Sequence, residues 1–140
     1  MGDGETMATY LTQPLVTNLR NIDVSLGGQG APIVHLGEKF LFRDYYVCVN
    51  FGGICNISFE SFGFDVAPCN MMLNMVAHFQ NNRCTFDQDG RLAMSGEVAK
   101  HLLRELNSLE FYSRSPPKSL GREWFEECVQ DIITKVFSMS

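Results

Sequence analysis

Two short apolar runs on either side of a pair of glycines form the clearest pattern in the chain. Residues Tyr45 to Val49 and Ile54 to Phe59 are rich in β-branched and aromatic side chains, and they flank Gly52-Gly53. This arrangement is typical of two strands joined by a glycine turn. Glycines tolerate positive φ and leave bare N–H groups, which suit a phosphate but also occur in ordinary hairpins. Both interpretations of the turn remain open.

Apolar residues recur at strand-like or helix-like spacing along the rest of the chain. We expect strands at Pro14 to Leu19 and near Phe62 to Phe64, and helices at Gly4 to Thr12, Pro68 to about Asn81, Arg91 to about Leu109 with a break near Ser95-Gly96, and Gly121 to Phe137. The inward side chains of the last helix are expected to be Trp124, Phe125, Cys128, Ile132 and Val136. The mixture predicts an α/β fold.

The stretch from Asp23 to Pro32 fits no regular element. Its Gly27 to Pro32 run holds three glycines and a proline within six residues. Such a composition predicts a loop whose backbone passes close to a ligand or to a neighbouring strand.

A single acidic residue, Asp65, stands where an apolar strand is expected to end and a helix to begin at Pro68. A carboxylate at the carboxyl end of a strand can act as a base or a metal ligand. The same carboxylate can also cap the free N–H groups of the following helix. The residues alone favour neither role.

Composition narrows the function classes. The chain has sixteen acidic and eleven basic side chains, with no basic stripe interleaved with aromatic residues, so we expect no nucleic-acid partner. No apolar run approaches membrane-spanning length and no signal-peptide pattern opens the chain, so we expect a cytoplasmic protein without a membrane partner.

Five cysteines without a C-x-x-C pair predict free thiols, and three scattered histidines predict no metal site. The acidic loop Asp87 to Gly90 lacks the distal glutamate of a calcium loop, since Val98 stands there.

Four blocks together resemble the 1,6-anhydro-N-acetylmuramic acid kinases, sugar kinases of the actin-like ATPase superfamily. They occur in the family's order over nearly the whole chain. The blocks are Asp23 to Pro32, Asn50 to Asn56, Asp65 to Asn70 and Pro116 to Glu123.

The resemblance implies a partial actin-like, ribonuclease-H-like fold. Residues 1–42 would end the first lobe with its sugar-side loop, and residues 43–140 would start the second lobe with the glycine-turn hairpin and helices. The implied reaction is ATP-dependent phosphorylation with hydrolytic opening of the 1,6-anhydro ring, a step of cell-wall peptidoglycan recycling. ATP, Mg²⁺ and a small anhydrosugar are the implied ligands.

Site residues follow from the same resemblance. Asp65 matches the catalytic base, which takes a proton from the attacking water. Gly52, Gly53 and Asn56 match the phosphate and nucleotide side, while the sugar side is matched by Arg20, Asp23, Gly28, Gln29 and Gly30. Arg20 has an alternative as the partner of Asp23 in a surface ion pair. Lys118 and Arg122 are further candidates for phosphate contact, and Ser119 is the candidate cap of the last helix.

The sequence also departs from the family pattern. Asn18-Leu19 stands where the family has Asp-Phe, and Val66 to Asn70 replaces Thr-Gly-Pro-Gly-Asn. The Gly-Thr-Ser phosphate loop and the adenosine-binding segment are not found. The alternative is therefore a non-catalytic sugar-binding or interaction module, and we expect no turnover by this chain alone. Incomplete lobes would expose apolar faces, so a homodimer is a candidate assembly.

Overall fold

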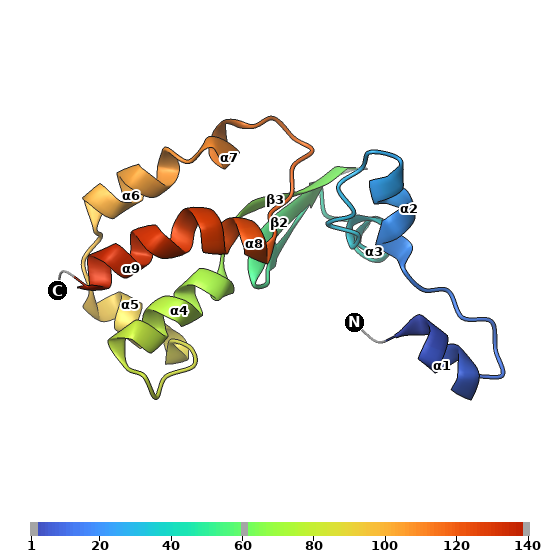
Figure 1. The fold of residues 1–140 in the computed structure, drawn as a ribbon. Coiled ribbons are helices and arrows are strands. Elements are labelled where there is room, and N and C mark those ends of the chain that lie inside the picture. The colour runs from blue at the N-terminus through green and yellow to red at the C-terminus, as the bar shows by residue number, and fades with distance from the viewer. Residues whose placement is uncertain (1–2, 60–61, 139–140) are drawn as a thin grey trace.

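The computed structural model describes residues 3–59 and 62–138. Figure 1 shows one three-stranded sheet with helices on both sides of it. The strands are β1 (Val47–Phe51), β2 (Ile54–Phe59) and β3 (Phe62–Pro68). The helices are α1 (Gly4–Tyr10), α2 (Leu19–Ser25), α3 (His35–Leu41), α4 (Asn70–Gln80), α5 (Arg91–Ser95), α6 (Lys100–Asn107), α7 (Glu110–Ser113), α8 (Arg122–Phe125) and α9 (Asp131–Ser138).

The predicted hairpin is present. Strands β1 and β2 pair antiparallel, with Val47 opposite Phe59 and Phe51 opposite Cys55, and the two glycines form the turn. Strand β3 pairs antiparallel with the other edge of β2 and extends the strand expected near Phe62 to Phe64 as far as Pro68. A register shift beside Cys55 and Asn56 interrupts this second ladder. The α/β class is confirmed, with an antiparallel sheet among the described residues.

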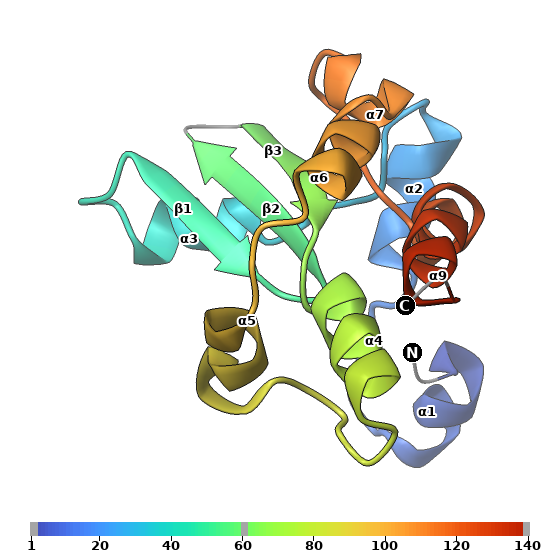
Figure 2. The same ribbon diagram turned by 90° about the vertical axis from the view of Figure 1, so that its left-hand side faces the viewer.

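The core lies on the side of the sheet covered by α4, α6, α8 and α9. Phe125, Val129 and Ile133 are buried there, and apolar side chains of α4 and α6 pack against them. In Figure 2, α4 and α6 lie in front of the sheet and α3 lies behind it. Burying one such large apolar side chain contributes about 1.5–3 kcal/mol, so this cluster supplies much of the folding free energy.

The long C-terminal helix is confirmed, and so is the inward position of Phe125, but beyond it the most buried face lies one position later than predicted. Val129 and Ile133 are buried to 1% and 2% exposure, whereas their neighbours Cys128 and Ile132 are only half-buried. A π-helical turn at Glu126–Gln130 separates α8 from α9. Because a π turn adds a residue to the helix, it rotates the side chains that follow, and a constant 3.6-residue period misses this.

The strand expected at Pro14 to Leu19 is wrong. Residues 14–18 form neither helix nor strand, and Val16 is 75% exposed. A strand needs a neighbour to pair with, and no described strand lies beside this run. Asn18 instead has φ 57° and turns the chain into α2, which begins at Leu19.

The irregular stretch expected around Asp23 is also wrong in its first part, since Asp23 lies inside α2. The loop proper begins at Gly27. Helix α3, which the sequence pattern did not reveal, then packs on the sheet. The Ser58 hydroxyl donates to the Glu38 carboxylate. Pro32, just before α3, lies close to Gly63 of β3, since a Cβ added to Gly63 would be 3.1 Å from Pro32 Cγ.

Helix α4 begins at Asn70, two residues later than predicted, because Pro68 completes β3. The break expected near Ser95-Gly96 is confirmed between α5 and α6. The acidic loop before α5 is a helix start, in which the Asp87 carboxylate accepts the Leu92 and Ala93 N–H groups at 2.9 and 3.0 Å. None of the helices in the described part of the chain has the length and apolar character needed to cross a bilayer.

Candidate functional site

Asp65 lies inside β3 and is buried to 4% exposure. Its N–H donates to the Lys118 carbonyl at 2.9 Å, and its carboxylate Oδ2 accepts the Leu120 N–H at 2.8 Å. The expected position at a strand end is therefore wrong, and so is the alternative as a cap of α4. The carboxylate faces the segment Lys118–Leu120, which we call the strap.

Burial is the largest influence on the Asp65 carboxyl group and raises its pKa. The Leu120 N–H and the charge of Arg20 act in the opposite direction without cancelling it, so the pKa stays above its ordinary value. A carboxyl group with a raised pKa accepts a proton more readily than an exposed one does. The arrangement suits a general base.

Arg20 occupies the first turn of α2 and is exposed. Its charge reaches Asp65, although the two residues are 45 positions apart in the sequence numbering. The alternative ion pair with Asp23 is not among the ion pairs of the described residues. The Arg20 guanidinium is within electrostatic range of the buried Asp65 carboxylate.

Asp23 braces the glycine loop. Its carboxylate Oδ2 accepts the Gly30 N–H at 2.6 Å, while its carbonyl accepts the Gly28 N–H at 2.8 Å. Gly27 and Gly30 have φ of 87° and 64°, a backbone region that favours glycine. The Asp23 carboxylate lies directly against Gly28, where a Cβ would collide with it. Asp23 therefore shapes the predicted sugar-side loop from within.

Gln29 connects this loop to the strap. The Ser119 hydroxyl donates to Gln29 Oε1 at 3.2 Å, across 90 residues of sequence. Residues from three of the four sequence blocks thus meet around Asp65. Ser119 does not cap the last helix as expected, since Gly121 is the cap position of α8. The roles of Ser119 and Leu120 were missed because periodicity gives no information on contacts this distant in sequence.

The turn at Gly52 and Gly53 is fixed to the start of α4 by its carbonyl groups. Gly53 accepts the Cys69 and Met71 N–H groups at 3.0 and 3.1 Å, and Gly52 accepts the Asn70 N–H at 3.1 Å. Neither glycine has a positive φ, so the turn does not use the left-handed conformation that glycine permits. A Cβ on Gly53 would meet nothing within 4 Å, so packing within the described chain does not require glycine there.

Asn56 lies opposite Asp65 in the β2–β3 ladder. The residue assigned to the nucleotide side and the residue assigned as base are therefore neighbours on adjacent strands. The turn lies at one end of this ladder, beside α4, and the strap contacts the ladder through Asp65.

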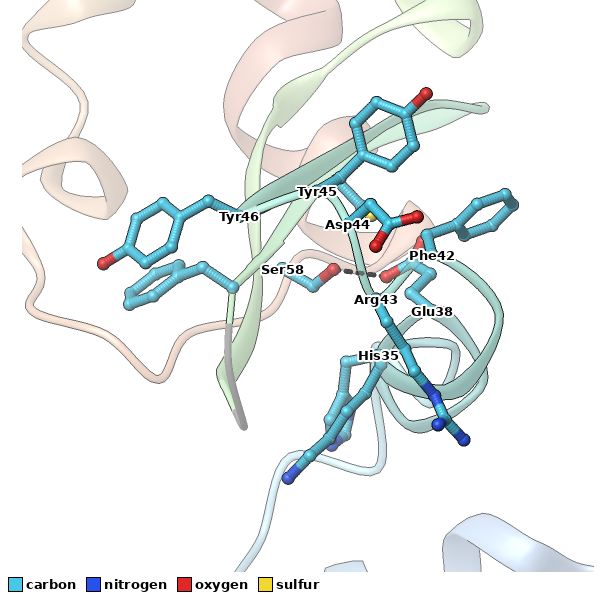
Figure 3. Close-up of a pocket in the computed structure, with 11 residues that line it drawn as sticks. His35, Glu38, Phe42, Arg43, Asp44, Tyr45, Tyr46 and Ser58 are labelled. Carbon is cyan, nitrogen blue, oxygen red and sulfur yellow. Dashed lines mark hydrogen bonds between the residues drawn. The ribbon is translucent and has the colours of Figure 1, made fainter.

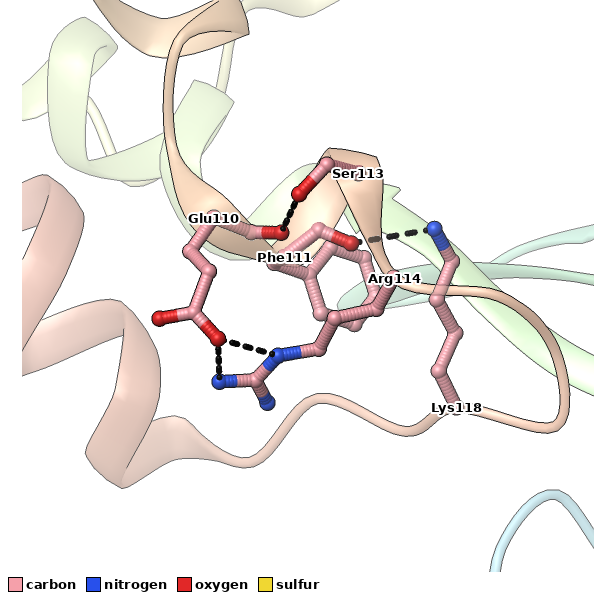
Figure 4. Close-up of polar contacts among 5 residues, drawn as sticks. All are labelled: Glu110, Phe111, Ser113, Arg114 and Lys118. Carbon is pink, nitrogen blue, oxygen red and sulfur yellow. Dashed lines mark hydrogen bonds and ion pairs between the residues drawn. The ribbon is translucent and has the colours of Figure 1, made fainter.

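The two basic candidates for phosphate contact have partners within the chain. Lys118 Nζ donates to the Phe111 carbonyl at 3.0 Å and lies 4.6 Å from the centre of the Phe111 ring (Figure 4). Arg122 forms an ion pair with Glu126 at 2.7 Å. Figure 4 also shows Arg114 paired with Glu110 on α7. Lys118 thus anchors the strap to the buried Phe111.

A separate groove of about 480 Å³ lies between α3 and the sheet (Figure 3). Glu38 and Ser58 meet in it, and Tyr45 and Arg43 point to opposite sides. None of the residues assigned from the sequence lines it. The described residues contain no group of three or more His, Cys, Asp or Glu side chains placed to hold a metal ion.

Comparison with known proteins identifies the relatives. The family model for anhydro-N-acetylmuramic acid kinase matches residues 1–135. The chain is 35% identical over 135 residues to the kinase of that name from Coxiella burnetii (strain RSA 493 / Nine Mile phase I), covering 89% of the chain and 36% of the relative. It is 38% identical over 134 residues to the one from Streptomyces coelicolor, covering 89% of the chain and 34% of the relative.

The chain is also 32% identical over 142 residues to the anhydro-N-acetylmuramic acid kinase of Clostridioides difficile (strain 630), and this match covers 94% of the chain and 37% of the relative. The chain thus spans about a third of the length of these curated relatives. On the family match over residues 1–135 and these identities, the chain belongs to the anhydro-N-acetylmuramic acid kinase family.

Proposed function

We propose that this chain provides the catalytic base and part of the sugar and nucleotide sites of an ATP-dependent kinase. Its substrate is 1,6-anhydro-N-acetylmuramic acid, which the reaction hydrolyses at the 1,6-anhydro bridge and phosphorylates at O6. The observation that carries this proposal is the meeting of Asp65, the strap and the glycine loop. Three segments distant in sequence converge on one buried carboxylate, whose pKa also responds to the charge of Arg20.

Asp65 is the base in this proposal. Leu120 holds Oδ2 by its N–H group, which fixes the plane of the carboxyl group. We assign the proton transfer to Oδ1. A water molecule that attacks the anomeric carbon gives its proton to this oxygen, and the bond from that carbon to O6 breaks. O6 then takes the γ-phosphoryl group of ATP, whose bond to the β,γ-bridging oxygen breaks as ADP leaves. A positioned general base typically contributes about 10²–10⁴-fold to such a step.

Arg20 and the loop Gly28-Gln29-Gly30 form the sugar side. The exposed guanidinium of Arg20 presents forked donors that match the lactyl carboxylate of the sugar. Asp23 holds the loop through the Gly30 N–H, so it positions the loop and leaves sugar contact to its neighbours. Gln29 keeps this loop next to the strap and hence next to Asp65.

Gly52, Gly53 and Asn56 form the nucleotide side. The open surface at Gly53 and the attachment of the turn to α4 support an approach of the ATP phosphates there. Mg²⁺ would neutralise phosphate charge, and such an ion is usually held by substrate phosphates, water and one or two carboxylates. We assign the fold to the actin-like type, with residues 1–42 ending one lobe and residues 43–140 starting the next.

A second candidate is a non-catalytic sugar-binding or interaction module of the same family. The observation in its favour is that Ala67 and Cys69 carry side chains shortly after Asp65, where the family resemblance expects glycines. Extra side-chain atoms there oppose close approach of the phosphates. Turnover distinguishes the two candidates.

The test replaces the matching segment of the Coxiella burnetii relative with residues 1–135 of this chain. Purified chimera is assayed for ADP release with and without 1,6-anhydro-N-acetylmuramic acid, and sugar binding is measured by calorimetry. The proposal predicts ADP release that saturates with sugar. A folded chimera that binds the sugar yet releases no ADP above the sugar-free rate would establish the binding module instead.

A further inference from the structure

Two cysteines lie near each other where the sheet meets α4. Cys55 is on β2 opposite Ala67, and Cys69 directly precedes α4. The N–H of Cys69 donates to the Gly53 carbonyl at 3.0 Å, which continues the ladder two residues beyond Ala67. Side chains two residues apart on one strand point to the same face, so Cys69 is the diagonal neighbour of Cys55.

This diagonal separation is close to what a disulfide needs. Diagonal neighbours in an antiparallel pair are about 7–8 Å apart, and the Cα atoms of a disulfide are up to about 6.8 Å apart. A shift of about 1 Å at Cys69 therefore suffices. Cys69 follows the end of β3, so the shift breaks no β2–β3 pairing before Pro68.

The electrostatics agree with this placement. Burial raises the pKa of the Cys55 thiol most, and the Cys69 thiol and the Asp65 carboxylate raise it further. Both sulfur groups are half-buried, so small reagents reach them slowly but do reach them.

The other three cysteines lie elsewhere. Cys48 is opposite Ser58, and the alternation of side chains along β1 puts it on the face away from Cys55. Cys84 follows α4, where its carbonyl contacts His78, and Cys128 packs beside the buried core cluster. Cys69 is thus the partner that the ladder gives to Cys55.

We propose that Cys55 and Cys69 form a dithiol site that closes to a disulfide when a two-electron oxidant is supplied. With diamide, both S–H bonds break, one S–S bond forms, and the two electrons and two protons pass to the N=N bond, which becomes a hydrazine. The bond joins β2 to the start of α4, beside the glycine turn and Asp65. Oxidation would therefore act on the proposed phosphate side of the site, although the dithiol chemistry does not depend on that function.

The test treats the folded 140-residue chain with diamide and measures the intact mass, which should fall by about 2 Da. Digestion with trypsin and a glutamate-specific protease should then yield fragment 44–60 linked to fragment 61–83, which holds Cys69 as its sole cysteine. Reaction should quicken as pH rises, because the raised pKa of Cys55 limits the thiolate fraction.

Variants separate the pair from its neighbours. Cys48→Ser removes the second cysteine of fragment 44–60 and should leave the link intact, whereas Cys55→Ser or Cys69→Ser should abolish it. Circular dichroism checks that each variant is folded. The linked fragments of the unmutated chain test the proposal even if a variant fails to fold. A link between any other two cysteines, or five thiols remaining after treatment, would overturn the proposal.

Discussion

At the scale of single residues, the pKa of Asp65 is set by a balance between burial, which raises it, and two interactions that lower it, the hydrogen bond from Leu120 and the charge of Arg20. A hydrogen bond to a carboxylate contributes about 1.5–3 kcal/mol to its charged form, and an exposed arginine contributes less because water screens it. The single N–H of Leu120 and the distant charge of Arg20 do not outweigh the loss of solvation at 4% exposure. The carboxyl group is therefore biased towards accepting a proton.

We predict that Asp65 titrates above the ordinary aspartate pKa of about 3.9. Carbon-13 NMR of the carboxyl groups measures this directly. Because the folded pKa lies above the unfolded one, this group favours the folded state most below the unfolded pKa, and that contribution is lost as pH rises through the folded pKa. Arg20→Ala should raise the Asp65 pKa further.

Asp87 is the internal control for this titration. The Ala93 and Leu92 N–H groups lower its pKa, so its stabilising contribution is present above the unfolded pKa and lost as pH falls through the folded one. Asp65 should thus titrate at a higher pH than Asp87. The opposite order would show that the Asp65 carboxylate is better solvated or better paired than its burial indicates.

Sequence reasoning identified Asp65 from its position between an apolar strand and a helix, but it could not supply the partners. Leu120 is 55 residues away and donates through its backbone, which carries no side-chain signal. Asp23 shows the same limit. The family resemblance assigned Asp23 to the sugar side, and the structure places its carboxylate on the Gly30 N–H.

At the scale of elements, the sequence predicted those strands and helices that have a local signature, whereas the structure of the other segments depends on contacts with segments distant in the chain. The hairpin around Gly52-Gly53 was predictable because both its strands and its turn have local signatures. The run at Pro14 to Leu19 has strand-like composition and no strand to pair with, so it forms no strand and is mostly exposed. Helix α2 begins after Asn18, which takes a left-handed conformation that few residues other than glycine and asparagine adopt.

The glycine loop offers a test at this scale. In Gly30→Ala the new Cβ would lie 2.8 Å from Val24 Cγ2 at a residue with φ 64°. Steric and backbone strain should together lower the free energy of unfolding by about 1–3 kcal/mol. Urea unfolding followed by circular dichroism measures the change.

Gly53→Ala is the matched control, since its Cβ would meet nothing within 4 Å and its φ is outside the left-handed region. We expect its free energy of unfolding to stay within about 1 kcal/mol of the parent. Equal losses in the two variants would contradict the assignment of Gly30 as the constrained position.

At the scale of the whole molecule, the two parts of the chain differ in how much they bury. The buried apolar side chains of the described residues lie between Pro68 and Ile133, whereas residues 3–46 bury only Gly30. The first part is connected to the sheet by contacts such as Glu38 with Ser58, and to the strap by Gln29 with Ser119. The proposed sugar side thus depends on those contacts for its place beside Asp65.

The central claim is that Asp65 is the general base of a kinase site. The most direct measurement is kcat of the Coxiella burnetii chimera carrying Asp65→Asn. Asp89→Asn is the control, because that carboxylate is exposed and contacts its close sequence neighbours Gln88 and Arg91. The account predicts that Asp65→Asn lowers kcat by at least about a hundredfold with little change in KM for the sugar, while Asp89→Asn stays near the parent. A near-normal kcat for Asp65→Asn would contradict it and reduce Asp65 to the residue that anchors the strap.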